Sequence, residues 1–285
     1  MIQQKKRLSR RDFLIRSTLF TAGAYLGSNL PARPLVHALP CGHTGHGDDY
    51  SRENPKLSII IDDVGYNTRR IEPFLRLGIP ITFSILPHLR YSRKLAETVQ
   101  AEGHEVMLHQ PMQPYSSSFD PGPGALYLKQ QTEEMYRIVE ENLASFAHAV
   151  GVNNHMGSQF TESEEKMAAV LKLFKNKGLF FVDSVTTSNS VAFNTARKLH
   201  MTTAFRNVFI DNQREKSYIC SQLVKLRKHA LKYGHAIGIG HPRPETVGAL
   251  EEFLDGLEGS GFSITYASQV VYTRETPAFF AGVYS

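Results

Sequence analysis

The chain has 285 residues, of which 41% are hydrophobic, and 32 Lys and Arg against 27 Asp and Glu give a net charge of +5. Residues 1–38 hold seven of the basic residues and one acid, a net of +6, which leaves about −1 for the rest of the chain. A nearly neutral body without a basic stripe argues against a nucleic-acid partner. The two cysteines, Cys41 and Cys220, are too few for a disulfide framework, although they could pair in an oxidising compartment.

The N-terminal residues have the pattern of an export signal. A basic region leads into Ser9-Arg10-Arg11-Asp12-Phe13-Leu14, which resembles a twin-arginine signal, so we expect residues 1–38 to engage the twin-arginine export machinery. Residues 17–32 are too short and too polar for a stable membrane span. We therefore expect a periplasmic or extracellular protein in which residues 39–55 form a linker.

Residues 56–65 predict a buried strand of a parallel sheet that ends on two acids. The run is apolar on both faces and stops abruptly at Asp62 and Asp63. Adjacent carboxylates repel each other and lose hydration when buried, so they need a cation or several hydrogen-bond donors. Because the chain then turns toward Gly65, we expect both acids to face one cleft. The alternative is that one acid caps the next helix while the other lies in solvent.

From Lys56 to about Val271 the chain repeats an amphipathic helix, a glycine and a short apolar strand. The glycines are Gly78, Gly103, Gly151, Gly178, Gly234 and Gly261, and we expect each to cap the C-terminus of a helix in the left-handed conformation. Alternating helices and strands predict a parallel sheet, either a barrel or doubly wound. A capping box from Thr161 to Glu164 predicts the start of a helix whose apolar face carries Met167, Leu171 and Phe174.

Ionisable residues follow directly on the apolar strands. They are Asp62, Asp63, His109, His155, Asp183 and His241. Since the carboxyl ends of parallel strands meet at one edge of the sheet, we expect these side chains to form one site. Asp63, His109 and His155 supply a carboxylate and two imidazoles, which suit a hydrolytic zinc site; nickel, cobalt or iron would also accept them. Taken singly, each histidine could instead be a buried structural residue.

Five motifs occur in a fixed order along residues 56–271. They are Ile61-Asp62-Asp63, Gly103-His104-Glu105 leading to His109, Asn154-His155-Met156-Gly157-Ser158, Phe181-Val182-Asp183-Ser184 and Gly238-Ile239-Gly240-His241-Pro242. This set resembles the divergent polysaccharide deacetylase family, a branch of the carbohydrate esterase superfamily with a NodB-homology-like barrel. The resemblance implies an α/β fold, a distorted (β/α) barrel with about seven parallel strands over residues 56–271, followed by a tail of residues 272–285.

The resemblance also implies a divalent metal, most simply Zn²⁺, at the C-terminal face of the barrel. By this resemblance Asp62 is the general base and Asp63 and His109 are metal ligands. In mainstream members of the superfamily a second ligand His stands four residues after the first, where this chain has Gln113, and their usual Arg-Pro motif is absent here. We expect His155 to replace the missing ligand.

The late strand-end residue His241 is by the same resemblance the general acid that protonates the leaving group. A carboxylate beside it would keep it protonated, and Asp183 is the expected partner. Alternatively, Asp183 caps the Ser/Thr-rich segment after it. On an expected strand over residues 205–211, Arg206 and Asp211 are expected to form a salt bridge.

These expectations lead to an exported metal-dependent hydrolase that removes acetyl groups from a glycan or polysaccharide. A degenerate barrel that binds glycan without turnover is the alternative, because one ligand histidine and the Arg-Pro motif are missing. A metal hydrolase with another amide or ester substrate is a third. The Pro/Gly/Ser-rich residues 111–129 predict a lid whose rings, Tyr115, Phe119 and Tyr127, stack on sugars, or a surface loop pinned by its own aromatics.

Overall fold

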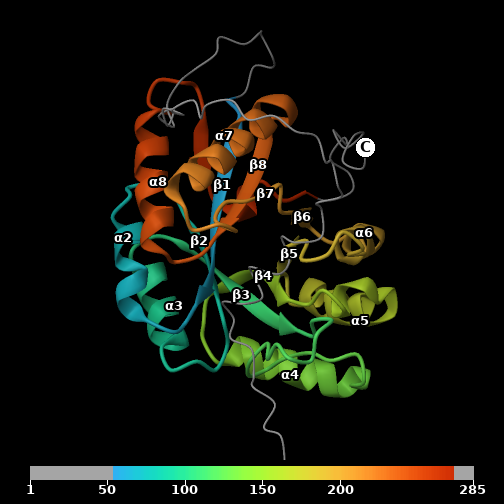
Figure 1. The fold of residues 1–285 in the computed structure, drawn as a ribbon. Helices are drawn as coiled ribbons and strands as arrows, with labels where there is room; N and C mark the ends of the chain where they lie inside the picture. The colour runs from blue at the N-terminus through green and yellow to red at the C-terminus, as the bar shows by residue number, and fades with distance from the viewer. Residues whose placement is uncertain (1–53, 273–285) are drawn as a thin grey trace, which may run out of the picture.

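The computed structural model describes residues 54–272 (Figure 1). Its strands are β1 (Lys56–Val64), β2 (Thr82–Ile85), β3 (Glu105–Met112), β4 (Ala149–Met156), β5 (Phe180–Asp183), β6 (Thr203–Phe205), β7 (Val208–Phe209), β8 (His235–Gly240) and β9 (Ser263–Thr265). Its α-helices are α2 (Glu72–Leu75), α3 (Ser92–Ala101), α4 (Thr132–Ala144), α5 (Glu164–Asn176), α6 (Ala192–Lys198), α7 (Lys216–Tyr233) and α8 (Pro244–Asp255), and η1 (Thr68–Arg70), η2 (Phe160–Glu162) and η3 (Ala267–Gln269) are 3₁₀ turns.

Some expectations concern residues outside this part of the chain. The export signal, Cys41, most of the linker and the tail from residue 273 lie outside the described residues. Among the helices that are described, none has the length and apolar character needed to cross a membrane.

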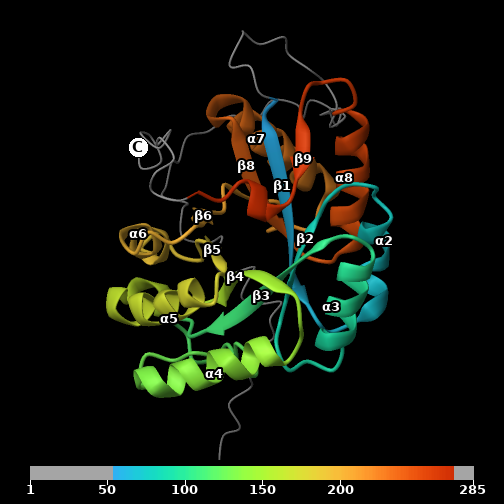
Figure 2. The same ribbon diagram turned by 180° about the vertical axis from the view of Figure 1, so that it is seen from behind.

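All strands of the sheet run parallel, in the order β6-β5-β4-β3-β2-β1-β8-β7. The second half of β1 pairs with β2, and its first half pairs with β9, which lies beside it in the rear view (Figure 2). Although β6 and β7 are at opposite ends of the order, only Arg206 and Asn207 separate them in the chain. The two ends of the sheet are therefore brought together, which confirms the distorted barrel. The strand expected over residues 205–211 is broken, so eight strands lie along the path.

The sheet buries both of its faces. Side chains such as Leu57, Ile59 and Ile61 point outward and pack beneath the helices, which surround the curled sheet (Figure 1). Ile60 and Met107 belong to a smaller inner cluster inside the barrel. Since side chains alternate along a strand, the inner face of each strand can be followed to its carboxyl end, where the site residues lie.

Five of the six predicted C-cap glycines have the expected backbone. Gly78, Gly103, Gly178, Gly234 and Gly261 have φ between 67° and 80° and each precedes a strand. The prediction for Gly151 is wrong, because this residue lies inside β4. A side chain there would collide with the ring of Phe180, so packing between neighbouring strands rather than helix termination explains this glycine.

The start of α5 also differs from the prediction. The N-cap is Ser163, whose side chain accepts a hydrogen bond from the backbone N–H of Lys166. Thr161 instead donates its hydroxyl to the carbonyl of Gly157, so the predicted capping box begins two residues too early. The expected apolar face, Met167, Leu171 and Phe174, is fully buried.

Gly151→Ala is expected to lower the free energy of unfolding by about 1–3 kcal/mol, because close-packed cores tolerate extra atoms poorly. The added methyl group would lie 2.5 Å from the ring of Phe180. As a control, Gly248→Ala in α8 meets no atom closer than 4.0 Å and should raise stability by up to about 1 kcal/mol through helix propensity. Urea unfolding measures both changes. An unchanged midpoint for Gly151→Ala would contradict the tight packing of β4 against β5.

Candidate active site

The two acids at the end of β1 reach the same cavity by different means. Asp62 lies on the inner face of the strand, in step with Ile60, and its side chain is buried. Alternation alone would direct Asp63 outward, but the pairing with β2 shifts register between Ile61 and Val64, and Asp63 has φ 58°. With this left-handed turn, Asp62 and Asp63 both line one cavity.

Asp63, His109 and His155 converge on one point at the mouth of the barrel. The Oδ1 atom of Asp63 lies 3.0 Å from Nδ1 of His155 and 3.4 Å from Nε2 of His109. The two imidazole nitrogens lie 3.1 Å apart. These residues come from β1, β3 and β4, and among residues 54–272 they form the one group whose ligand atoms are close enough to share a metal ion.

This cluster fits a divalent cation. Oδ1 of Asp63 is buried and makes no hydrogen bond although two ring nitrogens face it. Burial alone would raise the pKa of Asp63, but the charge of His155 and the close polar contact with His109 hold that pKa well below its ordinary value, so the carboxylate is ionised. Tetrahedral zinc with bonds of about 2.0–2.1 Å places its ligand atoms about 3.3 Å from one another. The observed separations match that spacing.

Asn153, which the sequence reasoning missed, orients the cluster. Its side-chain oxygen lies 2.8 Å from Nδ1 of His109, and its NH₂ group donates to Oδ1 of Asp62 at 2.8 Å. Because an amide oxygen can only accept, His109 carries a proton on Nδ1, and its Nε2 faces Asp63. The spacing was a usable signal, because Asn153 stands two residues before His155 and therefore on the same face of β4.

Asp62 is a buried carboxylate beside the cluster, and its pKa is raised. Its Oδ2 atom lies 3.6 Å from Nε2 of His109, beside the proposed cation position. Burial raises its pKa above the ordinary value, against the opposing effects of His109, His241 and the hydrogen bond from Asn153. A carboxylate with a raised pKa accepts a proton more readily than an exposed one.

His241 follows β8 and is paired with a carboxylate that the sequence reasoning assigned elsewhere. Its Nδ1 atom lies 2.7 Å from Oδ1 of Asp211, whose Oδ2 accepts hydrogen bonds from the backbone N–H of His241 and the hydroxyl of Thr246. Burial lowers the pKa of His241, but the charge of Asp211 outweighs it and raises the pKa to about 9. The imidazole is therefore protonated at neutral pH with Nε2 free of Asp211.

The expectation that Asp183 is the partner of His241 is wrong. Asp183 shares the outer face of β5 with Phe181, so its carboxylate points away from the barrel interior. There it accepts hydrogen bonds from the hydroxyl of Ser190 and from the backbone N–H of Phe193 near the start of α6. These contacts agree with the alternative prediction, in which Asp183 caps the Ser/Thr-rich segment that follows it.

Arg206 does not form the expected salt bridge with Asp211. Its guanidinium donates to the carbonyl oxygens of Ser184 and Val185 and lies 3.7 Å from the ring centroid of Phe209. Burial lowers its pKa to about 10, so it remains charged at neutral pH. The residue holds the turn after β5, where Val185 has the strained φ of 47°.

Gln113, four residues after His109, has a structural role. Its side chain donates to Gln159 and accepts from the backbone N–H of Leu128. It therefore ties the loop of residues 111–129 to the turn after β4. His155, on the neighbouring strand β4, is the residue that joins Asp63 and His109 in the cluster.

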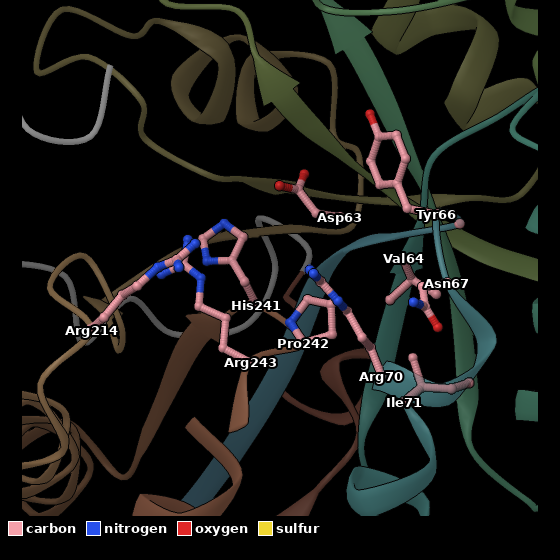
Figure 3. Close-up of a pocket in the computed structure, with 11 residues that line it drawn as sticks. Asp63, Val64, Tyr66, Asn67, Arg70, Ile71, Arg214, His241, Pro242 and Arg243 are labelled. Atoms are coloured by element: carbon pink, nitrogen blue, oxygen red, sulfur yellow. The ribbon is translucent and has the colours of Figure 1, made fainter. Parts of the chain in front are cut away.

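Two cavities meet at the cluster. The first, called here the aromatic cavity, has a volume of about 320 Å³ and is lined by Asp62, His109 and His155 together with Phe119 and Phe209. Phe119 belongs to the loop that was expected to act as a lid. The second, called here the arginine cavity, has a volume of about 380 Å³ and is lined by Arg70, Arg214, Arg243, Tyr66 and Asn67 (Figure 3). Asp63, His241 and Arg243 line both cavities.

Known proteins are similar to this chain in sequence. A sequence profile described as divergent polysaccharide deacetylase matches residues 59–271. A Haemophilus influenzae protein is 32% identical over 208 residues, 73% of this chain and 74% of the relative. YibQ of Escherichia coli is 33% identical over 202 residues, 71% of this chain but 63% of the YibQ chain.

A solved structure has the same fold. The crystal structure of protein ATU2773 from Agrobacterium tumefaciens aligns with a TM-score of 0.73 at 21% identity, covering 78% of this chain and 92% of that one. The profile match spans most of the chain and includes every residue of the cluster. This chain therefore belongs to the divergent polysaccharide deacetylase family.

Proposed function

We propose that the protein is a metal-dependent hydrolase that removes acetyl groups from a glycan. The observation that carries this proposal is the convergence of Asp63, His109 and His155 on one point, with Asp62 beside them and His241 across the same cavity. Ligands, base and acid in one cleft are the groups that hydrolysis of an amide or ester requires. Family membership supports a glycan as the substrate.

Asp63, His109 and His155 would hold the cation, most simply Zn²⁺. When bound, such a cation polarises an acyl carbonyl and lowers the pKa of water. Asp62 would take a proton from the attacking water, since its carboxylate is buried beside the cluster and its pKa is raised. Asn153 would keep that carboxylate in place through its 2.8 Å hydrogen bond.

His241 would donate the proton that the leaving group needs. Asp211 holds its Nδ1 atom, so Nε2 is the nitrogen that can reach the leaving amine or alkoxide. The protonated state persists at neutral pH because of the same carboxylate. Phe119, in the aromatic cavity, would contact the sugar that carries the acyl group.

Acetate release tests the function. The metal-loaded protein is expected to release acetate from acetylated oligosaccharides, and Asp62→Asn should lower kcat by about 10²–10⁴-fold by removing the proton acceptor. Asparagine keeps an oxygen that accepts from Asn153, so the fold should be unaffected. If metal-loaded wild-type protein binds the oligosaccharides but releases no acetate, the protein is a glycan-binding barrel without turnover.

Variants of the cluster separate loss of metal from loss of chemistry. His155→Ala should weaken metal binding by more than roughly 100-fold, because it removes a ligand rather than a supporting contact. Asp62→Asn should retain the metal, and so should the control His200→Asn, an exposed histidine whose φ of 52° asparagine tolerates. Elemental analysis after dialysis measures the metal content of each variant. Full metal content in His155→Ala would exclude this ligand set.

Asp211→Asn is expected to move the alkaline limit of activity to lower pH. In the wild type, His241 loses its proton as the pH rises through its pKa of about 9, so activity should fall there. Without the carboxylate charge, burial would lower that pKa, and activity should fall at a lower pH. The pH profile of kcat/KM measures the shift. Equal alkaline limbs in both proteins would show that His241 is not the acid.

We also propose that the protein is exported by the twin-arginine route, supported by the paired arginines of residues 1–38. Replacing Arg10 and Arg11 by Lys should retain the protein in the cytoplasm, whereas Arg16→Lys should not. Fractionation of cells that express each variant measures the distribution. Export of the double variant at the wild-type level would exclude this route.

A further inference from the structure

The arginine cavity is a basic chamber next to the proposed cation position. Its walls come from three separate segments: the turn after β1, which supplies Arg70, the segment before α7, which supplies Arg214, and the start of α8, which supplies Arg243 (Figure 3). Residues so distant in the sequence meet because each segment follows the carboxyl end of a strand. The cavity opens beside Asp63 and His241, the residues through which it joins the aromatic cavity.

Negative charge within the cavity does not balance the arginines. In the part of the chain that the structure describes, Arg70 and Arg214 form no ion pair with an acidic residue. Arg243 donates to the backbone oxygen of Asp211 and lies 3.5 Å from its carboxylate, which is shared with His241. Among residues 54–272, Asp63 is the one acid on the cavity wall, and its carboxylate belongs to the proposed cation site.

Arg243 gives the arginine cavity one cationic group in a fixed position. Its side chain is 11% exposed and is held against a fully buried carboxylate, so one guanidinium is fixed in the cavity wall. Arg70 and Arg214 are exposed and can adjust around a ligand. Guanidinium groups offer paired N–H donors that match the two oxygens of a carboxylate or phosphate group. Tyr66 and Asn67 add polar groups to the same wall.

We propose that the arginine cavity binds an anionic group of the substrate, so that the preferred substrate is an acidic glycan with a carboxylate or phosphate close to its acylated position. This inference rests on the proposed deacetylase function, because it places the acyl group at the cluster. The cavity, about 380 Å³, lies within the range of small-ligand sites. The anion lies on the arginine side of His241, and the acyl group lies in the aromatic cavity beside Asp62.

Three oligosaccharides that differ only at carbon 6 test the proposal. They are a short oligomer of N-acetylglucosamine, the same oligomer oxidised to a carboxylate at carbon 6, and the same oligomer phosphorylated there. Calorimetric titration of the metal-loaded mature protein, with Asp62→Asn used to prevent turnover, should give at least about tenfold tighter binding of an anionic oligomer than of the neutral one. The tighter of the two anionic oligomers identifies the group that the site prefers.

Arg70→Gln and Arg214→Gln should each weaken binding of the preferred anionic oligomer by about fivefold to tenfold and change binding of the neutral oligomer by less than about twofold. The control is Arg93→Gln on α3, an exposed arginine that lines neither cavity and should leave all three affinities unchanged. Equal affinities for the three oligomers when all arginines are present, or anion binding that survives the Arg70→Gln/Arg214→Gln double change, would overturn the proposal.

Acetate release from the same three oligomers by the metal-loaded protein with Asp62 intact distinguishes the two proposals. If all three oligomers are deacetylated with the same kcat/KM and bound equally, the anion site is wrong and the deacetylase function stands. If no oligomer releases acetate but the anionic ones bind tightly through the two arginines, the deacetylase function is wrong and the anion site stands.

Discussion

One buried amide, that of Asn153, sets the geometry of the site. Its oxygen accepts from His109 on β3 and Ser84 on β2, and its NH₂ group donates to Asp62 on β1. Since only one orientation of the amide satisfies all three contacts, four neighbouring strands are fixed in register where the proposed base and a proposed ligand must meet. Turning Asp62 or His109 away from Asn153 would leave a buried polar atom without a hydrogen bond, at a cost of about 1–3 kcal/mol.

The backbone is strained around the aromatic cavity. Asp63, Met156 and Val185 have φ of 58°, 49° and 47°, and all three line the aromatic cavity. Such conformations are costly for residues with a side chain, above all for a β-branched one, and they persist where the surrounding structure holds them. At Asp63 the strained turn brings an outward-facing position to the inner mouth. At Val185 the guanidinium of Arg206 binds the carbonyl and holds the turn.

The fold could be predicted from sequence because local signals agreed. Glycines such as Gly178 and Gly234 end helices, apolar runs follow them, and ionisable residues close the runs. The same signals brought Asp63, His109 and His155 together as candidate ligands, because the carboxyl ends of parallel strands share one edge. Gly151 misled the prediction, since a glycine needed for close strand packing looks the same in sequence as one that ends a helix.

The partner of His241 could not be predicted because it depends on which face of a strand a residue occupies. Asp183 and Asp211 both follow short apolar runs, but Phe181 packs outward under the helices, whereas Phe209 packs against the inner cluster. Alternation then sends Asp183 outward and Asp211 inward. A single-residue difference in register decides which acid meets His241. The break between β6 and β7 that sets this register falls at the polar residues Arg206 and Asn207, which were expected to lie within one strand.

The two cavities differ in the charge that they favour in a ligand, and His241 lies where they meet. An anion beside Asp62 would repel the carboxylate of this proposed base, whereas the same anion beside Arg70 and Arg214 would meet charges that no described acid pairs with. Asp211 does not cancel the charge of Arg70 and Arg214. Its carboxylate is bound by His241 and Thr246 and lies near Arg243. Under the two proposals, a substrate that spans the junction would therefore be held by its charge on one side and hydrolysed on the other.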